Sequence, residues 1–422
     1  MRWLAKSGTG TRPISHFLVL GFYIVVVISL VASGLGMLWV NGRVGQRLVV
    51  TLENSTKPIN SPDAGAPQGT DWDLNTQGLD TRNFLLTGSD NGSCTDPNSA
   101  TAGGIGDRTN FGERSDTIMI IRIDPSSKRA AILSFPRDLW VDIAGTTRQN
   151  RINSAFQSTD PNRLVATIEK NFQIPIDHYV NINFCAFKEI VTAVDGVKVP
   201  FLYPTRDKKT GFNVTAPGCI TFDGDTALAY VRSRSGYRYF DTTKQKWIED
   251  PTGDLGRISR QQDFLRRSMQ RALDKGSSSL SVANSLLNAA LKNVITDDGL
   301  TLRGMLTLAQ AMRDLNTHTV ATYTIESYPK RIGELSVLIP STKSVTMQQI
   351  LAIFQGKAPL AVQQTAMHPS VEPHGEQAVE QAVELVAQHI DTATTTVTTT
   401  IPGTAPAQKT IGVVPPNDPD CR

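Results

Sequence analysis

Apolar residues recur along this chain in short runs whose spacing changes between that of strands and that of helices. The clearest case is a pair of apolar runs over residues 117–123 and 129–135, separated by Asp124-Pro125-Ser126-Ser127. Proline at the second turn position behind an aspartate is typical of a tight turn. The pattern predicts a β-hairpin over these residues.

Four charged residues gather at the open end of this hairpin. With the register centred on the turn, Asp116 and Arg137 face each other there, and Arg114 and Asp138 lie beside them. Charges at strand ends are common, so one interpretation is two surface ion pairs that close the hairpin. A hairpin built only for packing does not need Arg-x-Asp and Arg-Asp at one end, which favours a functional site.

Further along the chain the two spacings alternate. Strands are predicted over residues 83–87, 179–184, 197–201 and 319–325, and helices over 161–172, 186–194, 224–230, 253–273, 280–293, 300–315 and 346–355. Asp160 is expected to cap the first of these helices. Because strands and helices are interleaved, the fold class is α/β or a mixed three-layer arrangement.

Two of these segments carry arginines at spacings that suit an anion. If residues 231–234 are extended, Arg232 and Arg234 point to the same side, where they repel each other unless an anion lies between them. In the helix over 253–273, Arg257, Arg260 and Gln261 share one face at i, i+3 and i+4. The amides at the start of that helix also favour an anion.

The N-terminal part has the pattern of a membrane anchor. Residues 17–39 are 23 residues without a formal charge, which is long enough to cross a bilayer as a helix. Basic residues flank both ends, and with the amino terminus counted the balance slightly favours a cytoplasmic N-terminus. The expected order is a cytoplasmic stretch (1–16), one transmembrane helix (17–39), an extracytoplasmic linker (40–80), the main folded domain (81–357) and a mostly disordered Thr- and Pro-rich tail (358–422).

Composition narrows the range of functions. A net charge of +3 without a lysine- or arginine-rich run argues against nucleic acid as a partner. The chain has no Gly-x-Ser-x-Gly, His-Glu-x-x-His, phosphate-binding loop or dinucleotide motif. Of the six histidines only His178 lies well inside the expected core, where a structural role is more common than a catalytic one. Four cysteines suit disulfides outside the cytoplasm, and three full pairings are open.

What remains is a set of arginines with acids among them. Guanidinium groups match phosphate oxygens in pairs, and carboxylates beside them hold Mg²⁺, a cation usually shared with substrate phosphates. The alternative is a scatter of surface ion pairs. Together these residues are suited to bind a pyrophosphate. They are Asp90, Arg114, Asp116, Arg137, Asp138, Arg232, Arg234, Arg257, Arg260 and Gln261.

Six short motifs follow one another over about residues 81–357: Gly88-Ser89-Asp90, Arg114-Ser115-Asp116-Thr117, Ser134-Phe135-Pro136-Arg137-Asp138, Arg151-Ile152-Asn153, Tyr230-Val231-Arg232-Ser233-Arg234, and Asp254-Leu255-Gly256-Arg257 with Arg260-Gln261. With these motifs in this order, the chain resembles the LytR-CpsA-Psr family of membrane-anchored glycopolymer transferases. The resemblance implies a three-layer α/β/α fold with a mixed sheet, and transfer of a phosphoglycosyl polymer from an undecaprenyl- or decaprenyl-pyrophosphate carrier to peptidoglycan outside the membrane.

The resemblance also implies roles for individual residues. Asp90 and Asp116 would bind Mg²⁺, and Asp138 or Asp116 is a candidate base beside Arg137 at the reacting phosphate. The pyrophosphate would be held by Arg114, Arg137, Arg232, Arg234, Arg257 and Gln261, with Arg260 in support.

Three further expectations follow from the comparison with this family. The polyprenyl chain needs an apolar slot, and Leu164, Val165, Ile168 and Phe172 lie either on its wall or, more commonly for such residues, in the core. The long insertion over 91–111 decides whether Asp90 reaches the metal, and one disulfide is expected between Cys185 and Cys219. Segments near 211–219 and 235–253 resemble actinobacterial members, for which arabinogalactan is the expected polymer, with teichoic acid or a similar polymer as the alternative.

Two other functions compete with the transferase. The same site could hydrolyse polyprenyl pyrophosphates with water as the acceptor. The chain could also be a non-catalytic envelope scaffold or regulatory protein, although a scaffold does not need paired aspartates beside several arginines.

Overall fold

The computed structural model describes residues 48–53, 79–90, 94, 115–360, 406–418, 420 and 421. The predicted transmembrane segment, most of the 91–111 insertion and Arg114 lie outside these residues. Within the described part, no helix combines the length and the apolar character needed to cross a bilayer.

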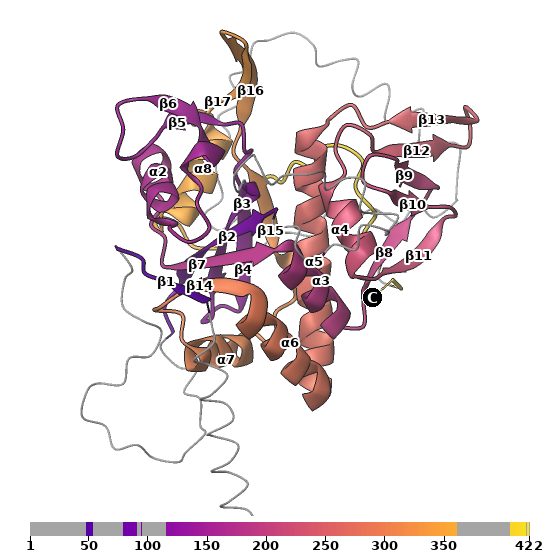
Figure 1. The fold of residues 1–422 in the computed structure, drawn as a ribbon, viewed down its shortest axis with the longest axis horizontal. Helices are drawn as coiled ribbons and strands as arrows, with labels where there is room; N and C mark the ends of the chain where they lie inside the picture. Colours follow the sequence, from indigo (N-terminus) through magenta and orange to yellow (C-terminus); the bar gives the residue numbers. More distant parts are fainter. Residues whose placement is uncertain are drawn as a thin grey trace, which may run out of the picture.

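The described strands form a central seven-stranded mixed sheet (Figure 1). Strand pairs β1/β14, β7/β2 and β4/β15 are parallel, and the other pairs are antiparallel. In spatial order the strands are β1 (Leu48–Val50), β14 (Val294–Asp297), β7 (His178–Asn183), β2 (Arg82–Ser89), β3 (Ser115–Asp124), β4 (Arg129–Ser134) and β15 (Ala321–Thr324).

The predicted hairpin at the centre of this sheet is confirmed. Strands β3 and β4 pair antiparallel with Asp124 opposite Arg129, so the register is centred on the turn as expected. Asp124 Oδ1 accepts a hydrogen bond from the Ser126 backbone N–H at 3.0 Å, which explains why this aspartate suits the turn. The central strands are buried on both faces, consistent with their nearly continuous apolar runs.

Helices cover both faces of the sheet. On one face, α2 (Asn162–Phe172) and α8 (Val345–Phe354) pack on Leu85, Ile118, Ile120 and Leu133. On the other face, α5 (Asp254–Ser278) and α7 (Leu302–Ala311) pack on residues such as Met119 and Ile132, with α6 (Leu280–Asn293) nearby (Figure 1). The predicted α/β class with helices around a mixed sheet is confirmed.

A second hydrophobic core lies on the far side of α5 from the central sheet. Its aromatic residues Phe201, Phe212, Phe222 and Tyr230 are packed with ring centroids 5.2–6.0 Å apart. The elements around it are α3 (Phe184–Ala193), β8 (Val197–Phe201), β9 (Thr205–Asp207), β10 (Phe212–Val214), β11 (Gly218–Phe222), α4 (Gly224–Arg232), β12 (Arg238–Asp241) and β13 (Lys246–Glu249). Only β8 and the two helices were predicted, because the other strands are only three to five residues long.

Most of the remaining elements lie near the open end of the β3–β4 hairpin, whereas η3 (Thr317–Thr319) directly precedes β15 and packs against α5. A bridge between Leu139 and Leu338 joins β17 to the segment that follows β4. The second hairpin, β16 with β17, projects beyond the sheet (Figure 1). These elements are β5 (Trp140–Asp142), β6 (Gln149–Arg151), η2 (Ile152–Ala155), η3 (Thr317–Thr319), β16 (Ser327–Ile332) and β17 (Leu335–Pro340).

Two local predictions were wrong. The N-cap of α2 is Pro161, one residue after the predicted Asp160, and Pro161 makes no side-chain cap, although Asp160 Oδ1 does accept a hydrogen bond from the Asn162 backbone N–H at 3.2 Å. Helix α4 continues through Arg232, so residues 231–234 are not one extended piece. The helix is capped by Asp223, and the buried residues Tyr230 and Val231 continue its apolar face, which outweighs the β-propensity of valine.

The expected Cys185–Cys219 disulfide was also wrong. Cys94 pairs with Cys185 and Cys219 with Cys421. Cys185 lies in the first turn of α3, and Cys219 lies on β11. The partner of Cys185 is 91 residues away in the sequence, and the partner of Cys219 is 202 residues away.

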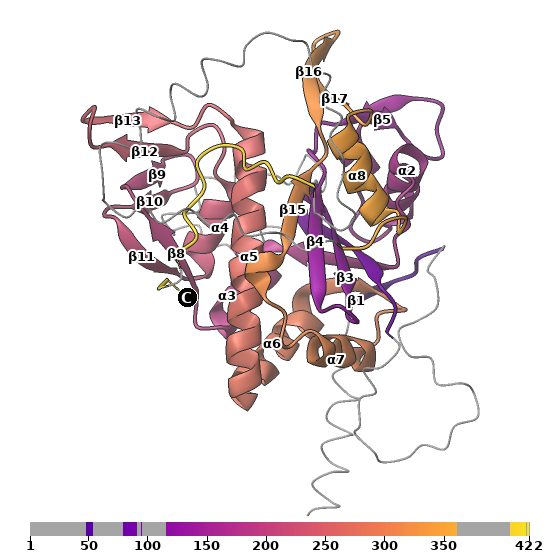
Figure 2. The ribbon, with the colours of Figure 1, turned by 180° about the vertical axis from the view of Figure 1, so that it is seen from behind.

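The described part of the tail, residues 406–418 with 420 and 421, runs along α5 (Figure 2). The Ile411 backbone N–H donates to Ser259 Oγ and the Val413 N–H to Asp250 Oδ2, both at 3.1 Å. Gly412, with φ +80°, lies against the backbone of Gly256 in the first turns of α5. These residues differ from the disorder expected for them, because hydrogen bonds and a disulfide hold a segment that composition alone would leave loose.

Candidate functional site

The charged site is built where β3, the segment after β4 and the first turns of α5 meet. Arg137 Nη1 donates to Asp116 Oδ1, and Arg257 Nη1 lies 3.4 Å from Asp116 Oδ2. Arg257 Nη2 also donates to the Asp116 backbone carbonyl at 2.7 Å. The hairpin and the helix, 141 residues apart in the sequence, are therefore joined through one aspartate.

Two further aspartates, Asp254 and Asp138, form ion pairs that orient these arginines. Asp254 lies 3.0 Å from Arg257 Nη2 and 3.6 Å from Arg234 Nη1. Asp138 lies 3.6 Å from Arg137 Nε and 3.3 Å from Arg151 Nε. The predicted pairing of Asp116 with Arg137 and the proximity of Asp138 are thus present, and Arg234 reaches the same site from the loop after α4.

Burial and the neighbouring charges have opposite effects on the pKa values of Asp116 and Arg137. Burial alone raises the pKa of the Asp116 carboxyl, but the positive charges of Arg257 and Arg137 outweigh it and hold that pKa below its usual value. For Arg137 burial lowers the pKa, and Asp116 more than reverses the effect. Burial lowers the pKa of Arg257, which is only 2 % exposed. Asp116 is therefore ionised at neutral pH and is a weak proton acceptor.

An apolar pocket opens beside this network, between the sheet and helices α3, α4 and α5. Its cavity is about 170 Å³, and its wall is largely aliphatic and aromatic. The apolar lining includes Leu86, Met119, Ile182, Phe184, Phe187, Val191, Leu228 and Leu265. Leu164, Val165, Ile168 and Phe172 do not line it, because α2 packs them into the core on the opposite face of the sheet.

Polar side chains of the predicted set stand at the mouth of this apolar pocket. Asp90, Asp116, Arg232, Arg257 and Gln261 all contribute to its lining. Arg232, the last residue of α4, places its guanidinium carbon 4.8 Å from the ring centroid of Phe184. Gln261 Nε2 donates to the Val231 carbonyl at 3.0 Å, and its buried Oε1 has no hydrogen-bond partner among the described residues.

Arg260 differs from the other arginines because it does not face the apolar pocket. Its side chain is fully buried and is held by Asp250 Oδ2 at 2.7 Å, the Ser233 carbonyl at 2.9 Å and the Val413 carbonyl of the tail at 3.3 Å. Its guanidinium stacks 3.9 Å from the Tyr237 ring centroid. Arg260 therefore holds α5 against the second core and the tail. It can support the arginines of the site only indirectly, through the position of α5.

The acidic residues at the pocket mouth fit a Mg²⁺ ion that is shared with a phosphate. Asp90 and Asp116 line one cavity, and Gln261 Oε1 offers a further unpaired oxygen there. No cluster of three or more His, Cys, Asp or Glu side chains suited to a metal occurs in the described residues. Such a site suits Mg²⁺, which uses one or two carboxylates and completes its shell with phosphate oxygens and water.

Several residues of the site were not singled out from the sequence. Asp254 precedes Arg257 by three residues on α5, a helical spacing that could have indicated the pair. Asp250 and the apolar wall from α3 and α4 gave no local signal, because their partners are distant in the sequence. His178 is a structural residue as predicted, with its ring Nδ1 3.1 Å from buried Asp297.

The arrangement is suited to an anion with an attached apolar chain. A cluster of arginines stands at the mouth of an aliphatic pocket, so a phosphate group and a hydrocarbon chain can be bound side by side. The cations are already oriented by Asp116, Asp138 and Asp254, so binding does not require them to reorganise.

The sequence is similar to those of several curated proteins. The polyisoprenyl-teichoic acid–peptidoglycan teichoic acid transferase TagU of Bacillus cereus is 35% identical over 196 residues, which are 46% of this chain and 58% of that protein. TagU of Enterococcus faecalis is 28% identical over 280 residues, 66% of this chain and 78% of that protein. The chain therefore spans less than two thirds of the first of these relatives.

Solved structures with this fold include a LytR-Csp2A-Psr enzyme from Actinomyces oris, with a TM-score of 0.51 and 21% identity, covering 73% of this chain and 96% of that one. A structure of TagT bound to LIIa-WTA has a TM-score of 0.51 and 22% identity, covering 73% and 98%. Residues 48–352, well over half of the chain, match the LytR_cpsA_psr family. The chain is a member of the LytR_cpsA_psr family.

Proposed function

We propose that this protein transfers a glycopolymer from a polyprenyl-pyrophosphate carrier to peptidoglycan and releases polyprenyl phosphate. The observation that carries the proposal is the Asp116–Arg137–Arg257 network at the mouth of an apolar pocket. TagU relatives are named for transfer of teichoic acid to peptidoglycan, and a solved structure of TagT is bound to LIIa-WTA. Teichoic acid and arabinogalactan are the two polymer classes to test.

In this proposal the carrier lies across the pocket mouth with its hydrocarbon chain inside. Arg137, Arg257 and Arg232 bind the pyrophosphate, and Arg234 extends the positive surface toward the polymer. A pyrophosphate-binding role for Arg114 follows from its sequence motif alone, because this residue lies outside those that the structure describes. An acceptor hydroxyl forms a bond to the sugar-linked phosphorus while the bond from that phosphorus to the oxygen of the polyprenyl phosphate breaks. The arginines stabilise the charge that spreads over the phosphoryl oxygens in this step.

Asp138 is the better candidate for the base that takes the proton of the acceptor hydroxyl. Asp116 has a lowered pKa and accepts a hydrogen bond from Arg137 Nη1, whereas Asp138 lies in longer ion pairs with Arg137 and Arg151, at 3.6 and 3.3 Å. Asp90, Asp116 and Gln261 Oε1 would hold Mg²⁺, which would neutralise charge on the pyrophosphate oxygens when bound. Gln261 keeps its orientation through the Val231 carbonyl.

We also propose that the domain is extracytoplasmic and is attached to the cell membrane through residues 17–39. Two disulfides support this location, because disulfides persist in oxidising compartments. The apolar pocket supports it as well, since a polyprenyl substrate is delivered from a membrane.

The test uses the full-length protein in detergent with a synthetic polyprenyl-pyrophosphate glycan, Mg²⁺ and a peptidoglycan acceptor. Release of lipid phosphate coupled to acceptor labelling is expected for the wild type and is expected to fall by at least about a hundredfold in Arg137→Ala and Asp116→Ala. Arg303→Ala, at an exposed arginine on α7 that forms no ion pair with another described residue, is the matched control and should retain activity.

The other outcomes decide between the competing functions. Lipid phosphate release without acceptor labelling would identify a hydrolase that uses the same site. An absence of turnover, with carrier binding unchanged in Arg137→Ala and Asp116→Ala, would overturn the assignment and favour a scaffold.

A further inference from the structure

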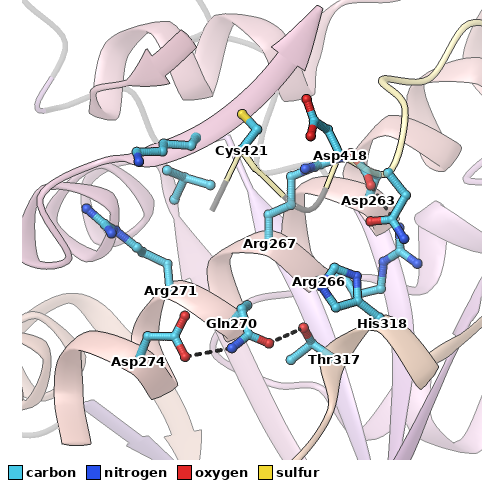
Figure 3. Close-up of a pocket in the computed structure, with 13 residues that line it drawn as sticks. Asp263, Arg266, Arg267, Gln270, Arg271, Asp274, Thr317, His318, Asp418 and Cys421 are labelled. Carbon is cyan, nitrogen blue, oxygen red and sulfur yellow. Dashed lines mark hydrogen bonds and ion pairs between the residues drawn. The ribbon is translucent and has the colours of Figure 1, made fainter. Parts of the chain in front are cut away.

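A second pocket lies on a different face of α5 from the apolar pocket. It is formed by α5, β8, η3 and the described tail (Figure 3). We call it the charged pocket and define it by its four permanent cations, Lys198, Arg266, Arg267 and Arg271. The proposed transferase mechanism uses none of them.

The cations of the charged pocket outnumber the carboxylates that compensate them. Arg266 Nη2 and Arg267 Nε both pair with Asp263, at 2.9 and 2.8 Å, so one carboxylate serves two guanidinium groups. Asp274 and Asp418 are the other carboxylates in the lining, which leaves four permanent cations against three acids. The balance is positive before His318 is considered.

Arg271 is fixed in place without a carboxylate. Its Nε donates to the backbone carbonyls of Val194 at 3.1 Å and Gly196 at 3.2 Å, just before β8. Its two Nη groups have no partner within the part of the chain that the structure describes. In Figure 3 Arg271 and Asp274 lie at one side of the charged pocket, and Arg266 and His318 lie at the other.

Lys198 and Arg267 complete the set from two further directions. Lys198 comes from β8 and forms no ion pair among the described residues. The Arg267 side chain is only 12 % exposed, and its Nη2 donates to the Pro416 carbonyl of the tail at 2.8 Å. The guanidinium and ammonium groups thus line one pocket from α5 and β8, and the tail covers one side of it.

The size of the charged pocket limits its ligand. Its cavity is about 40 Å³, which corresponds to roughly three water molecules on the same measure. A nucleotide or a sugar ring does not fit, whereas a tetrahedral oxyanion does. The oxygens of such an anion point in several directions, so they can accept hydrogen bonds from cationic side chains that come from different elements.

We propose that the charged pocket binds a phosphate-class oxyanion, either inorganic phosphate or a phosphate ester whose phosphate group enters the cavity. Such a ligand bridges Arg271 and Lys198 and brings Arg267, with the tail bound to it, into the same network. The site thereby ties the tail to α5 from the side opposite the apolar pocket. The proposal is independent of the transferase function.

Titration calorimetry on the full-length protein tests the proposal, with inorganic phosphate as one probe and dimethyl phosphate as the other. Lys198→Gln should weaken phosphate binding by about tenfold, because one charge-assisted contact is removed. Lys246→Gln on exposed β13 is the matched control and should bind as the wild type does. Arg271→Gln is a second variant, with a melting curve to show that it folds.

The proposed pyrophosphate site also attracts phosphate, so Arg137→Ala is measured in parallel. Binding that persists in Arg137→Ala and weakens in Lys198→Gln supports the charged pocket. Preference for inorganic phosphate over dimethyl phosphate would identify the free dianion or a monoester as the ligand, and equal binding would identify a diester. Phosphate binding that is unchanged in Lys198→Gln, or abolished in Arg137→Ala, would overturn the proposal.

Discussion

The Arg260–Asp250 pair provides the sharpest test of how helix α5 is held in the fold. Both side chains are almost completely buried, at 0 % and 1 % exposure, and Asp250 Oδ2 also accepts from the Val413 backbone N–H. Asp250→Ala leaves the Arg260 guanidinium buried with only two carbonyl partners, from Ser233 and the tail. Removing one partner of a buried ion pair costs about 3–5 kcal/mol, so we expect a loss of that size.

The assay is urea unfolding of the full-length protein with its disulfides intact, followed by tryptophan fluorescence. Glu249→Ala, which removes the exposed partner of Arg238, is the control and should leave the midpoint close to that of the wild type. Adding Arg260→Met to Asp250→Ala should restore part of the loss, because an apolar side chain of similar volume needs no counter-charge. A loss below about 1 kcal/mol in Asp250→Ala would refute the reasoning.

Three further predictions concern the tail and the network around Asp116. Gly412→Ala should lower the melting temperature more than Gly145→Ala, since both glycines have positive φ but only at Gly412 would a Cβ lie 2.7 Å from Asp250 Oδ2 and 3.0 Å from Gly256 Cα; equal melting temperatures would contradict the close packing. Asp116 has a pKa below its unfolded value, so its stabilising effect is present above about pH 4 and is lost as pH falls through the folded pKa. Asp116→Asn should therefore reduce the acid sensitivity of the unfolding midpoint, and an unchanged pH profile would show that the shift is absent. Cys421→Ser should destabilise the fold by about 2–5 kcal/mol and raise hydrogen exchange of the Ile411 and Val413 amides; unchanged exchange would mean that the tail is held without the disulfide.

The local elements of this fold could be predicted because their signals are local. The β3–β4 hairpin has its turn residues and both apolar runs within one short stretch, and its register brought Asp116 to Arg137. Helix α5 was likewise expected from its spacing, and Arg257 and Gln261 lie on the face that lines the apolar pocket. Here propensity, turn chemistry and pattern agree with the tertiary structure.

Other parts could not be predicted because their causes are distant in the sequence. Helix α4 runs on to Arg232 because its buried face meets Phe201 and Phe264 in the second core, which nothing near Val231 indicates. The disulfide partners of Cys185 and Cys219 depend on how the insertion and the tail return to the domain. The apolar pocket is formed by α3, α4 and α5 jointly, so no single helix carries its signature.

The contact between Arg260 and the tail sets an order of events during synthesis. Arg260 is buried against Asp250 and Ser233, which are close in the sequence, but its third partner, the Val413 carbonyl, follows 153 residues later. At about 5–20 residues per second the ribosome needs roughly 8–30 s to add that stretch. For that time the Arg260 guanidinium, in the second turn of α5, lacks its hydrogen bond to the Val413 carbonyl. A chain that stops before Val413 would remain in that state, so C-terminal truncation is expected to affect the folding of a helix that begins at Asp254.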